Sequence, residues 1–177
     1  MESRKGIDPT GTPCLKITTM AKLEYLIIHC TDTPPGREVT SKEIRDWHTL
    51  PVPQGRGWKQ VGYADMIHLD GKVENLVPYN EDDSVDAWEI TNGATGFNGN
   101  GRHIVYVGGR NFNGQWLDSR TPAQKVALEK YVKAFIKAHP NCKVAGHYQV
   151  NPGRDCPSFH TPDWLKSVGI LDKNIVL

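Results

Sequence analysis

The chain of 177 residues is long enough for one domain with a substantial hydrophobic core. Hydrophobic residues make up 38% of it and charged residues 23%, which is typical of a globular protein in water. A net charge of +1 argues against nucleic acid as the main partner, because phosphate binding depends on clustered, excess Lys and Arg. No apolar run approaches the roughly 18–20 residues of a membrane span, so no membrane partner is expected.

Residues 1–19 are polar and lack the apolar region and small-residue cleavage site of a secretory signal. We interpret this segment as a disordered leader or a cloning remnant, and we expect the folded domain to span residues 20–177. Without a signal, the protein is expected in the cytoplasm of the cell that produces it. Of the four cysteines, Cys14 lies in this segment and leaves an odd number, so a disulfide framework is not expected.

The first half of the chain is predicted to contain a central strand, a short helix and a β-hairpin. Residues 23–30 are apolar on both faces, as in a central strand. A capping-box pattern at residues 40–43 opens a short helix. The dipeptide Asp70-Gly71 is a strong hairpin turn signal between strands at 63–69 and 73–77.

The longest predicted helix lies in the second half of the chain. It starts at Thr121-Pro122, with proline at the first helical position, and ends at His139-Pro140. The other elements expected there are a glycine-rich loop at 92–101, a strand at 103–107, a short strand at 144–145 and a helical segment at 161–168. Strands and helices alternate irregularly around one hairpin, which favours a single α/β domain with a central mixed β-sheet flanked by α-helices.

Three residues have the chemistry and the position to form a metal site. His29 ends the apolar strand and His147 follows the short strand at 144–145, at the edge where open α/β sheets place their sites. The turn at 151–153 reverses the chain between His147 and Cys156 and could bring both side chains to one point. A catalytic zinc takes three protein ligands and keeps one position open. The set therefore indicates a zinc hydrolase with its site in a cleft at one edge of the sheet.

Each candidate also has an ordinary structural explanation. His29 could be satisfied by local backbone groups, and Cys156 could be a buried thiol beside an unrelated loop histidine. Tyr63 could donate a hydrogen bond to an oxyanion or simply pack in the sheet. Arg154 could place a positive charge beside a metal or lie in solvent. The remaining histidines are expected to have packing, capping or turn roles; they are His48, His68, His103, His139 and His160.

Ordered motifs along most of the chain match one known family. They are Leu-Ile-Ile-His-Cys-Thr at 26–31, Trp-His at 47–48, Val-Gly-Tyr at 61–63 leading to Asp-Gly at 70–71, His-Ile-Val-Tyr-Val-Gly-Gly at 103–109, Asp-Ser-Arg-Thr-Pro-Ala-Gln at 118–124, Gly-His at 146–147 and Cys-Pro-Ser-Phe at 156–159. From about residue 23 to 171, the chain resembles the zinc-dependent N-acetylmuramoyl-L-alanine amidases of the bacteriophage lysozyme-amidase and peptidoglycan recognition protein type.

This resemblance implies a ligand set and a reaction. His29, His147 and Cys156 correspond to the family's ligands for Zn²⁺. The implied reaction is hydrolysis of the amide bond between N-acetylmuramic acid and L-alanine in peptidoglycan by a zinc-activated water molecule. Tyr63 corresponds to the catalytic tyrosine, and it would stabilise the oxyanion together with Arg154. Arg154 replaces a lysine that is common in the family, and its planar guanidinium reaches differently from an ammonium group.

The implied partner is peptidoglycan or a muropeptide, bound by a monomer. An alternative is a non-catalytic peptidoglycan-binding module on the same fold, but such members typically lack the cysteine ligand, so Cys156 favours an enzyme. A third interpretation is a zinc-bearing interaction domain, which an intact groove with Tyr63 and Arg154 would contradict. The setting stays open between a phage endolysin, an exported toxin and a cytoplasmic recycling enzyme. In the first two cases the enzyme acts on the cell wall after release or export.

Overall fold

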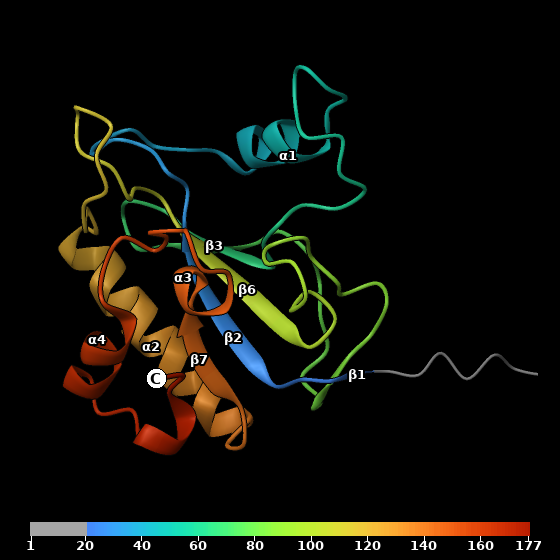
Figure 1. The fold of residues 1–177 in the computed structure, drawn as a ribbon, viewed down its shortest axis with the longest axis vertical. Coiled ribbons are helices and arrows are strands. Elements are labelled where there is room, and N and C mark those ends of the chain that lie inside the picture. Colours follow the sequence, from blue (N-terminus) through green and yellow to red (C-terminus); the bar gives the residue numbers. More distant parts are fainter. Residues whose placement is uncertain (1–20) are drawn as a thin grey trace, which may run out of the picture.

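A computed structural model of the protein describes residues 21–177, and a five-stranded mixed sheet lies at its centre (Figure 1). In spatial order the strands are β4 (Val73–Asn75), β3 (Asp65–Ile67), β6 (Gly101–Tyr106), β2 (Tyr25–Cys30) and β7 (Lys143–Gly146). Strands β3, β6, β2 and β7 run parallel, whereas β4 runs antiparallel to β3. The mixed sheet expected from the sequence is confirmed. The leader expected at residues 1–19 lies outside the described residues.

The helices expected from the sequence form close to their predicted bounds. They are α1 (Ser41–Thr49), α2 (Pro122–Ala138) and α4 (Thr161–Ser167). Thr40 caps α1 in a capping box with Glu43, and Thr121 caps α2 in another with Gln124. Two short elements were not predicted, α3 (His147–Val150) and the 3₁₀ turn η1 (Asp172–Asn174), because one helical turn is too short to show an apolar period.

The predicted β-hairpin is present, with shorter strands than expected. Strands β3 and β4 pair antiparallel from Asp65 opposite Asn75 to Ile67 opposite Val73. Gly71 turns the chain with φ +85°, a conformation that side chains disfavour. A separate two-stranded sheet, β1 (Ala21–Lys22) with β5 (Ser84–Val85), was not predicted, because two-residue strands leave no alternating pattern.

The two faces of the central sheet bury different clusters. Leu26 and Ile28 of β2 belong to the larger cluster, which includes Leu128 and Val132 of α2 and Leu165 of α4. A smaller cluster on the other side joins residues of α1, β3 and β6; it contains Val39, Ile44, Val61, Met66, Leu76, Val77, Val105 and Val107. Because side chains alternate along a strand, His29 faces away from α2. The polar site therefore lies on the face that α1 and its loops cover.

Within residues 21–177, no helix combines the length and the apolar character that a membrane crossing requires. Cys30, Cys142 and Cys156 are buried free thiols. The described part of the chain thus contains no disulfide. The thiol of Cys156 is therefore free to bind a metal ion.

Candidate metal centre

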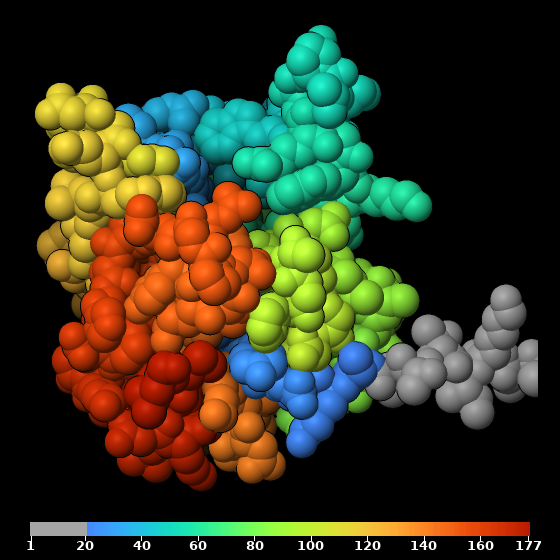
Figure 2. Space-filling view, viewed as in Figure 1, coloured from blue at the N-terminus to red at the C-terminus, as the bar shows by residue number. Residues whose placement is uncertain are grey.

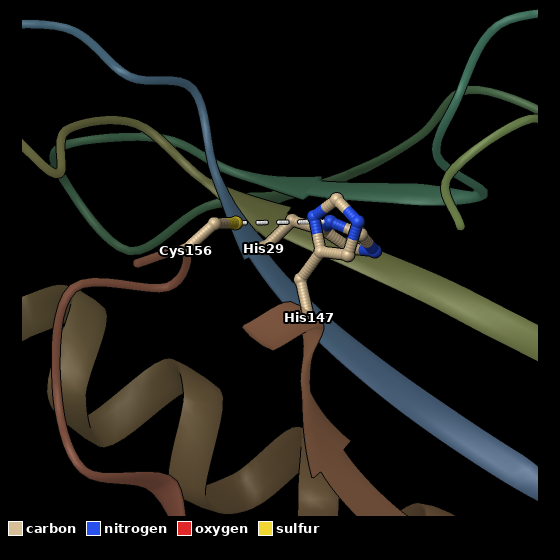
Figure 3. A group of neighbouring side chains, drawn as sticks. All are labelled: His29, His147 and Cys156. Carbon is tan, nitrogen blue, oxygen red and sulfur yellow. Dashed lines mark hydrogen bonds between the residues drawn. The ribbon is translucent and has the colours of Figure 1, made fainter. Parts of the chain in front are cut away.

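Side chains of His29, His147 and Cys156 point toward one another (Figure 3). Each offers one ligand atom, and these atoms all lie within 4.8 Å of one another. The Cys156 Sγ is 3.8 Å from Nδ1 of His29, and the His29 and His147 ring centroids are 4.5 Å apart. The three residues that the sequence singled out as metal ligands are thus brought to one point.

Two neighbouring parallel strands position the histidines. Gly146, the last residue of β7, pairs with Ile28 of β2, so His147 starts level with His29 at the carboxyl ends of the two strands. His147 opens α3, and the chain then turns back at Gly153, whose φ is +87°. The short strand leading into His147 and the turn at 151–153, both expected from the sequence, are therefore present.

Backbone contacts return Cys156 to the same point. Its carbonyl oxygen accepts a hydrogen bond from the Tyr148 N–H at 2.9 Å, which ties the loop to α3. The Tyr106 hydroxyl donates to the Pro157 carbonyl oxygen at 2.6 Å. The Cys30 N–H donates to Cys156 Sγ at 3.2 Å. These bonds hold the sulfur at the end of β2.

The donor set fits zinc. Zn–S bonds of about 2.3 Å and Zn–N bonds of about 2.0–2.1 Å, meeting at a tetrahedral angle, place sulfur and nitrogen about 3.6 Å apart. The observed separation of 3.8 Å between Cys156 Sγ and His29 Nδ1 agrees with this value. Two imidazoles and one thiol also match the three-ligand pattern of catalytic zinc sites, such as Cys₂His and His₃ sets, in number and donor type.

Burial keeps the two imidazoles neutral, which is the form that binds metals. Burial lowers the pKa of His29 well below its ordinary value, and the neighbouring His103 and His147 rings lower it further. The pKa of His147 is lowered as well, chiefly by burial. Burial raises the pKa of the Cys156 thiol, so a cation is needed beside it to favour the thiolate at neutral pH.

A cleft of about 330 Å³ opens beside these three residues. Tyr63 and Arg154, the other two candidate residues, both line it. The Tyr63 ring centroid is 5.1 Å from that of His29, and burial raises the pKa of its phenol above the ordinary value. Arg154 is exposed. Four of the five candidate site residues therefore line one cleft, and His29 lies beneath it in contact with Cys156 and Tyr63.

Two histidines that the sequence left in packing roles belong to this site. His48 of α1 accepts a hydrogen bond from the Gly62 N–H at 3.1 Å through Nδ1, and its ring stacks on Trp58. Burial lowers the pKa of His48 to about 4, so its ring stays neutral. It lines the cleft and holds the backbone that carries Tyr63. No short-range pattern in the sequence signals this contact between residues 14 positions apart.

His103 was expected only to begin a strand. The strand starts earlier, at Gly101, and His103 lies inside β6 with no exposed surface. Its Nδ1 is 3.0 Å from Nε2 of His29, on the neighbouring strand. Burial, together with the nearby His147, lowers the pKa of His103 to about 3. In the sequence, His103 stands in an apolar strand, on the same face as Val105 and Val107. No sequence pattern indicates that its partner is His29.

One rim of the cleft joins two distant segments. The Asn151 side-chain amide donates to the Thr95 carbonyl oxygen at 3.1 Å. Figure 2 shows the α3 region, in orange, directly beside the glycine-rich loop at 92–101, in yellow-green. The Asn151 Oδ1 also lies 3.2 Å from Nε2 of His147 and can accept a hydrogen bond from it, so one side chain links the loop to a candidate ligand.

A family model, a relative by sequence and two solved structures match this chain. Residues 19–159 match the family model described as N-acetylmuramoyl-L-alanine amidase. The endolysin of Enterobacteria phage T3 is 31% identical over 144 residues, covering 81% of this chain and 86% of the phage protein. Among solved structures, the amidase LysC from Clostridium intestinale has a TM-score of 0.63 at 20% identity, covering 85% of this chain and 88% of LysC. Drosophila PGRP-LB has a TM-score of 0.61 at 20% identity, covering 88% of each chain. The two structural matches show a shared fold.

Proposed function

Because the chain belongs to the N-acetylmuramoyl-L-alanine amidase family, we propose that it hydrolyses the amide bond between N-acetylmuramic acid and L-alanine with a zinc ion bound by His29, His147 and Cys156. The enzyme is a peptidoglycan hydrolase. The observation that carries the zinc assignment is the meeting of two neutral imidazoles and a thiol within 4.8 Å, beside an open cleft.

The chain's own residues have separable tasks in this reaction. Zinc, when bound, supplies a Lewis acid and an activated water molecule for attack on the lactyl carbonyl. The Tyr63 phenol stays protonated at neutral pH because burial raises its pKa, so it can donate a hydrogen bond to the oxygen that becomes negative. Arg154 adds a fixed positive charge at the cleft.

Two positions depart from the usual pattern of the resembling enzymes. Arg154 stands where a lysine is common, and it retains the positive charge with a planar arrangement of donors. Ala64 follows Tyr63 where a histidine is common, and it is buried. Tyr63 and Arg154 are the two candidate donors that the resemblance assigns, and both line the cleft.

We propose a setting in which a monomer acts on the bacterial cell wall after release or export from the cell that makes it. The support is the similarity to a phage protein that is named an endolysin. A recycling enzyme in the cytoplasm would share the same bond specificity, so the cleft chemistry is common to both settings. The substrate in either case is peptidoglycan or a soluble muropeptide.

The test is digestion of purified peptidoglycan with and without a zinc chelator, followed by mass spectrometry. We expect new amino termini on L-alanine, lost with chelator and restored by added zinc, without new reducing ends on the glycan strands. Cys156→Ser is the matched control, and it should lose both bound zinc and product. Wall that sediments with the protein yet stays uncut would identify the binding module instead.

A further inference from the structure

His29 makes polar contacts through both of its ring nitrogens. Nδ1 faces Cys156 Sγ at 3.8 Å, on the side of the candidate metal centre. Nε2 faces Nδ1 of His103 at 3.0 Å, on the side away from the sulfur. Both rings are buried, with 1% of His29 and 0% of His103 exposed. A contact of this length between two buried nitrogens is a hydrogen bond, in which one nitrogen donates and the other accepts.

The direction of this hydrogen bond decides which nitrogen of His29 has a free lone pair. A neutral imidazole has one N–H and one lone pair. If Nε2 of His29 donates to His103, the lone pair of His29 is on Nδ1, the atom that faces Cys156. If Nε2 accepts instead, Nδ1 carries the proton and points an N–H at the metal position. Only the first arrangement leaves His29 able to bind a cation beside Cys156.

The packing around His103 fixes the position of its ring. A Cβ atom at Gly93 would lie 2.4 Å from Nδ1 of His103 and 2.6 Å from its Cγ. It would also lie 2.5 Å from the Gly62 carbonyl oxygen. Glycine at position 93 therefore provides the space that the ring occupies. His103 is also tied to its strand, since β6 pairs with β2 and β3 on its two sides.

We propose that His103 is a positioning residue, which accepts the Nε2–H of His29 and so holds the His29 ring with Nδ1 ready for zinc. This inference rests on the proposed function. Groups that accept the second N–H of a metal-binding histidine fix its tautomer and orientation, and their loss typically weakens metal binding about 10- to 100-fold. A carboxylate or a carbonyl oxygen usually has this role; here it is a second imidazole, supplied by the adjacent strand.

The test compares His103→Asn with His103→Leu. Asparagine places an oxygen acceptor where Nδ1 of histidine lies. Leucine has the same branched shape as asparagine but has no hydrogen-bond acceptor. We expect His103→Leu to weaken zinc binding about 10- to 100-fold in competition with a chelator, and His103→Asn to stay within about 3-fold of the wild type. Gly93→Ala should weaken zinc binding in the same direction, because it displaces the His103 ring. Thermal unfolding of the metal-free variants checks that each one folds.

A second measurement needs no variant. Nitrogen-15 chemical shifts of the His29 ring in the metal-free wild type should show the proton on Nε2. A proton on Nδ1 would overturn the inference, as would equal zinc binding by the wild type and His103→Leu. Equal loss in His103→Asn and His103→Leu would also overturn it, because the acceptor would then be irrelevant. Failure of the wild type to bind zinc at all would instead contradict the proposed function, and the tautomer measurement would still decide the role of His103.

Discussion

At the scale of single residues, the site depends on where protons lie in a buried space. His29 and His147 are held neutral by burial, and each has one ring nitrogen facing an acceptor, His103 or Asn151. The opposite nitrogens are then available to a cation. Cys156 receives the Cys30 N–H, which favours negative charge on sulfur. Hydrogen bonds to neighbouring groups thus orient the side chains of the candidate metal centre.

Replacing Tyr63 with phenylalanine tests the hydroxyl alone. The ring and its packing against His29 and His48 remain, so zinc affinity and the melting temperature should match the wild type. The rate constant for peptidoglycan cleavage should fall about 100- to 1,000-fold, the usual loss on removal of one oxyanion donor. Zinc content by mass spectrometry and initial rates measure the two effects. Full turnover by Tyr63→Phe would rule out the donor role.

At the scale of elements, the site is assembled by segments that have little regular structure of their own. The turn after α3 brings back Cys156, the loop at 92–101 contacts Asn151, and the segment before β3 carries Tyr63. A polar link at the other end of β3 joins three segments. His68 bonds Glu38 through Nδ1 at 3.0 Å and Glu74 of β4 through Nε2 at 2.8 Å.

The link at His68 predicts a pH-dependent contribution to stability. Burial lowers the pKa of His68, but the Glu38 and Glu74 carboxylates outweigh it, and the pKa is raised in the folded protein. Protonated His68 therefore stabilises the fold fully at a pH below its unfolded value of about 6.5, as long as the two carboxylates stay ionised, and this contribution is lost as pH rises through the folded pKa.

The measurement is urea unfolding of the wild type and His68→Gln at pH 5.5 and pH 8.5. Glutamine can still form hydrogen bonds but does not titrate, so it removes the charge and keeps much of the shape. We expect the difference in unfolding free energy between the two proteins to be larger at pH 5.5. A difference that is the same at both pH values, or larger at pH 8.5, would contradict the ion-pair role of His68.

At the scale of the whole molecule, the candidate metal centre joins parts of the chain that are far apart in sequence. His29 lies in β2, His147 starts α3 and Cys156 follows in a loop (Figure 3). A ligand that binds the folded state and not the unfolded chain stabilises the fold by mass action. Zinc should therefore act as a cross-link between the sheet and the C-terminal part of the domain.

Zinc should raise the melting temperature of the wild type. Free zinc at 100 times its dissociation constant should add about 2.7 kcal/mol to the unfolding free energy. Differential scanning calorimetry with zinc and with chelator measures the shift, and Cys156→Ser should melt at the same temperature in both. A zinc-dependent shift of equal size in Cys156→Ser would place the bound ion elsewhere.

Much of the framework follows from local sequence. The apolar run at 23–30, the hairpin at Asp70-Gly71 and the capped helix from Thr121 all form, because apolar period, turn chemistry and helix caps act within a few residues. The elements that were missed, β1, β5, α3 and η1, are too short to leave a period. Their formation depends on partners elsewhere in the chain.

For the site, the sequence by itself determined which residues could hold a metal, since residue type fixes the donor chemistry of His29, His147 and Cys156. It also determined which residues could stabilise an oxyanion, Tyr63 and Arg154. Only the tertiary structure decided which other side chains surround these candidate ligands. His48 meets Gly62, and His103 meets His29, only after α1 covers the sheet and β6 pairs with β2. These contacts are long-range in sequence, so no local pattern encodes them. They arise because most buried polar groups in a folded protein are hydrogen-bonded, and here the partners lie on other elements of the fold.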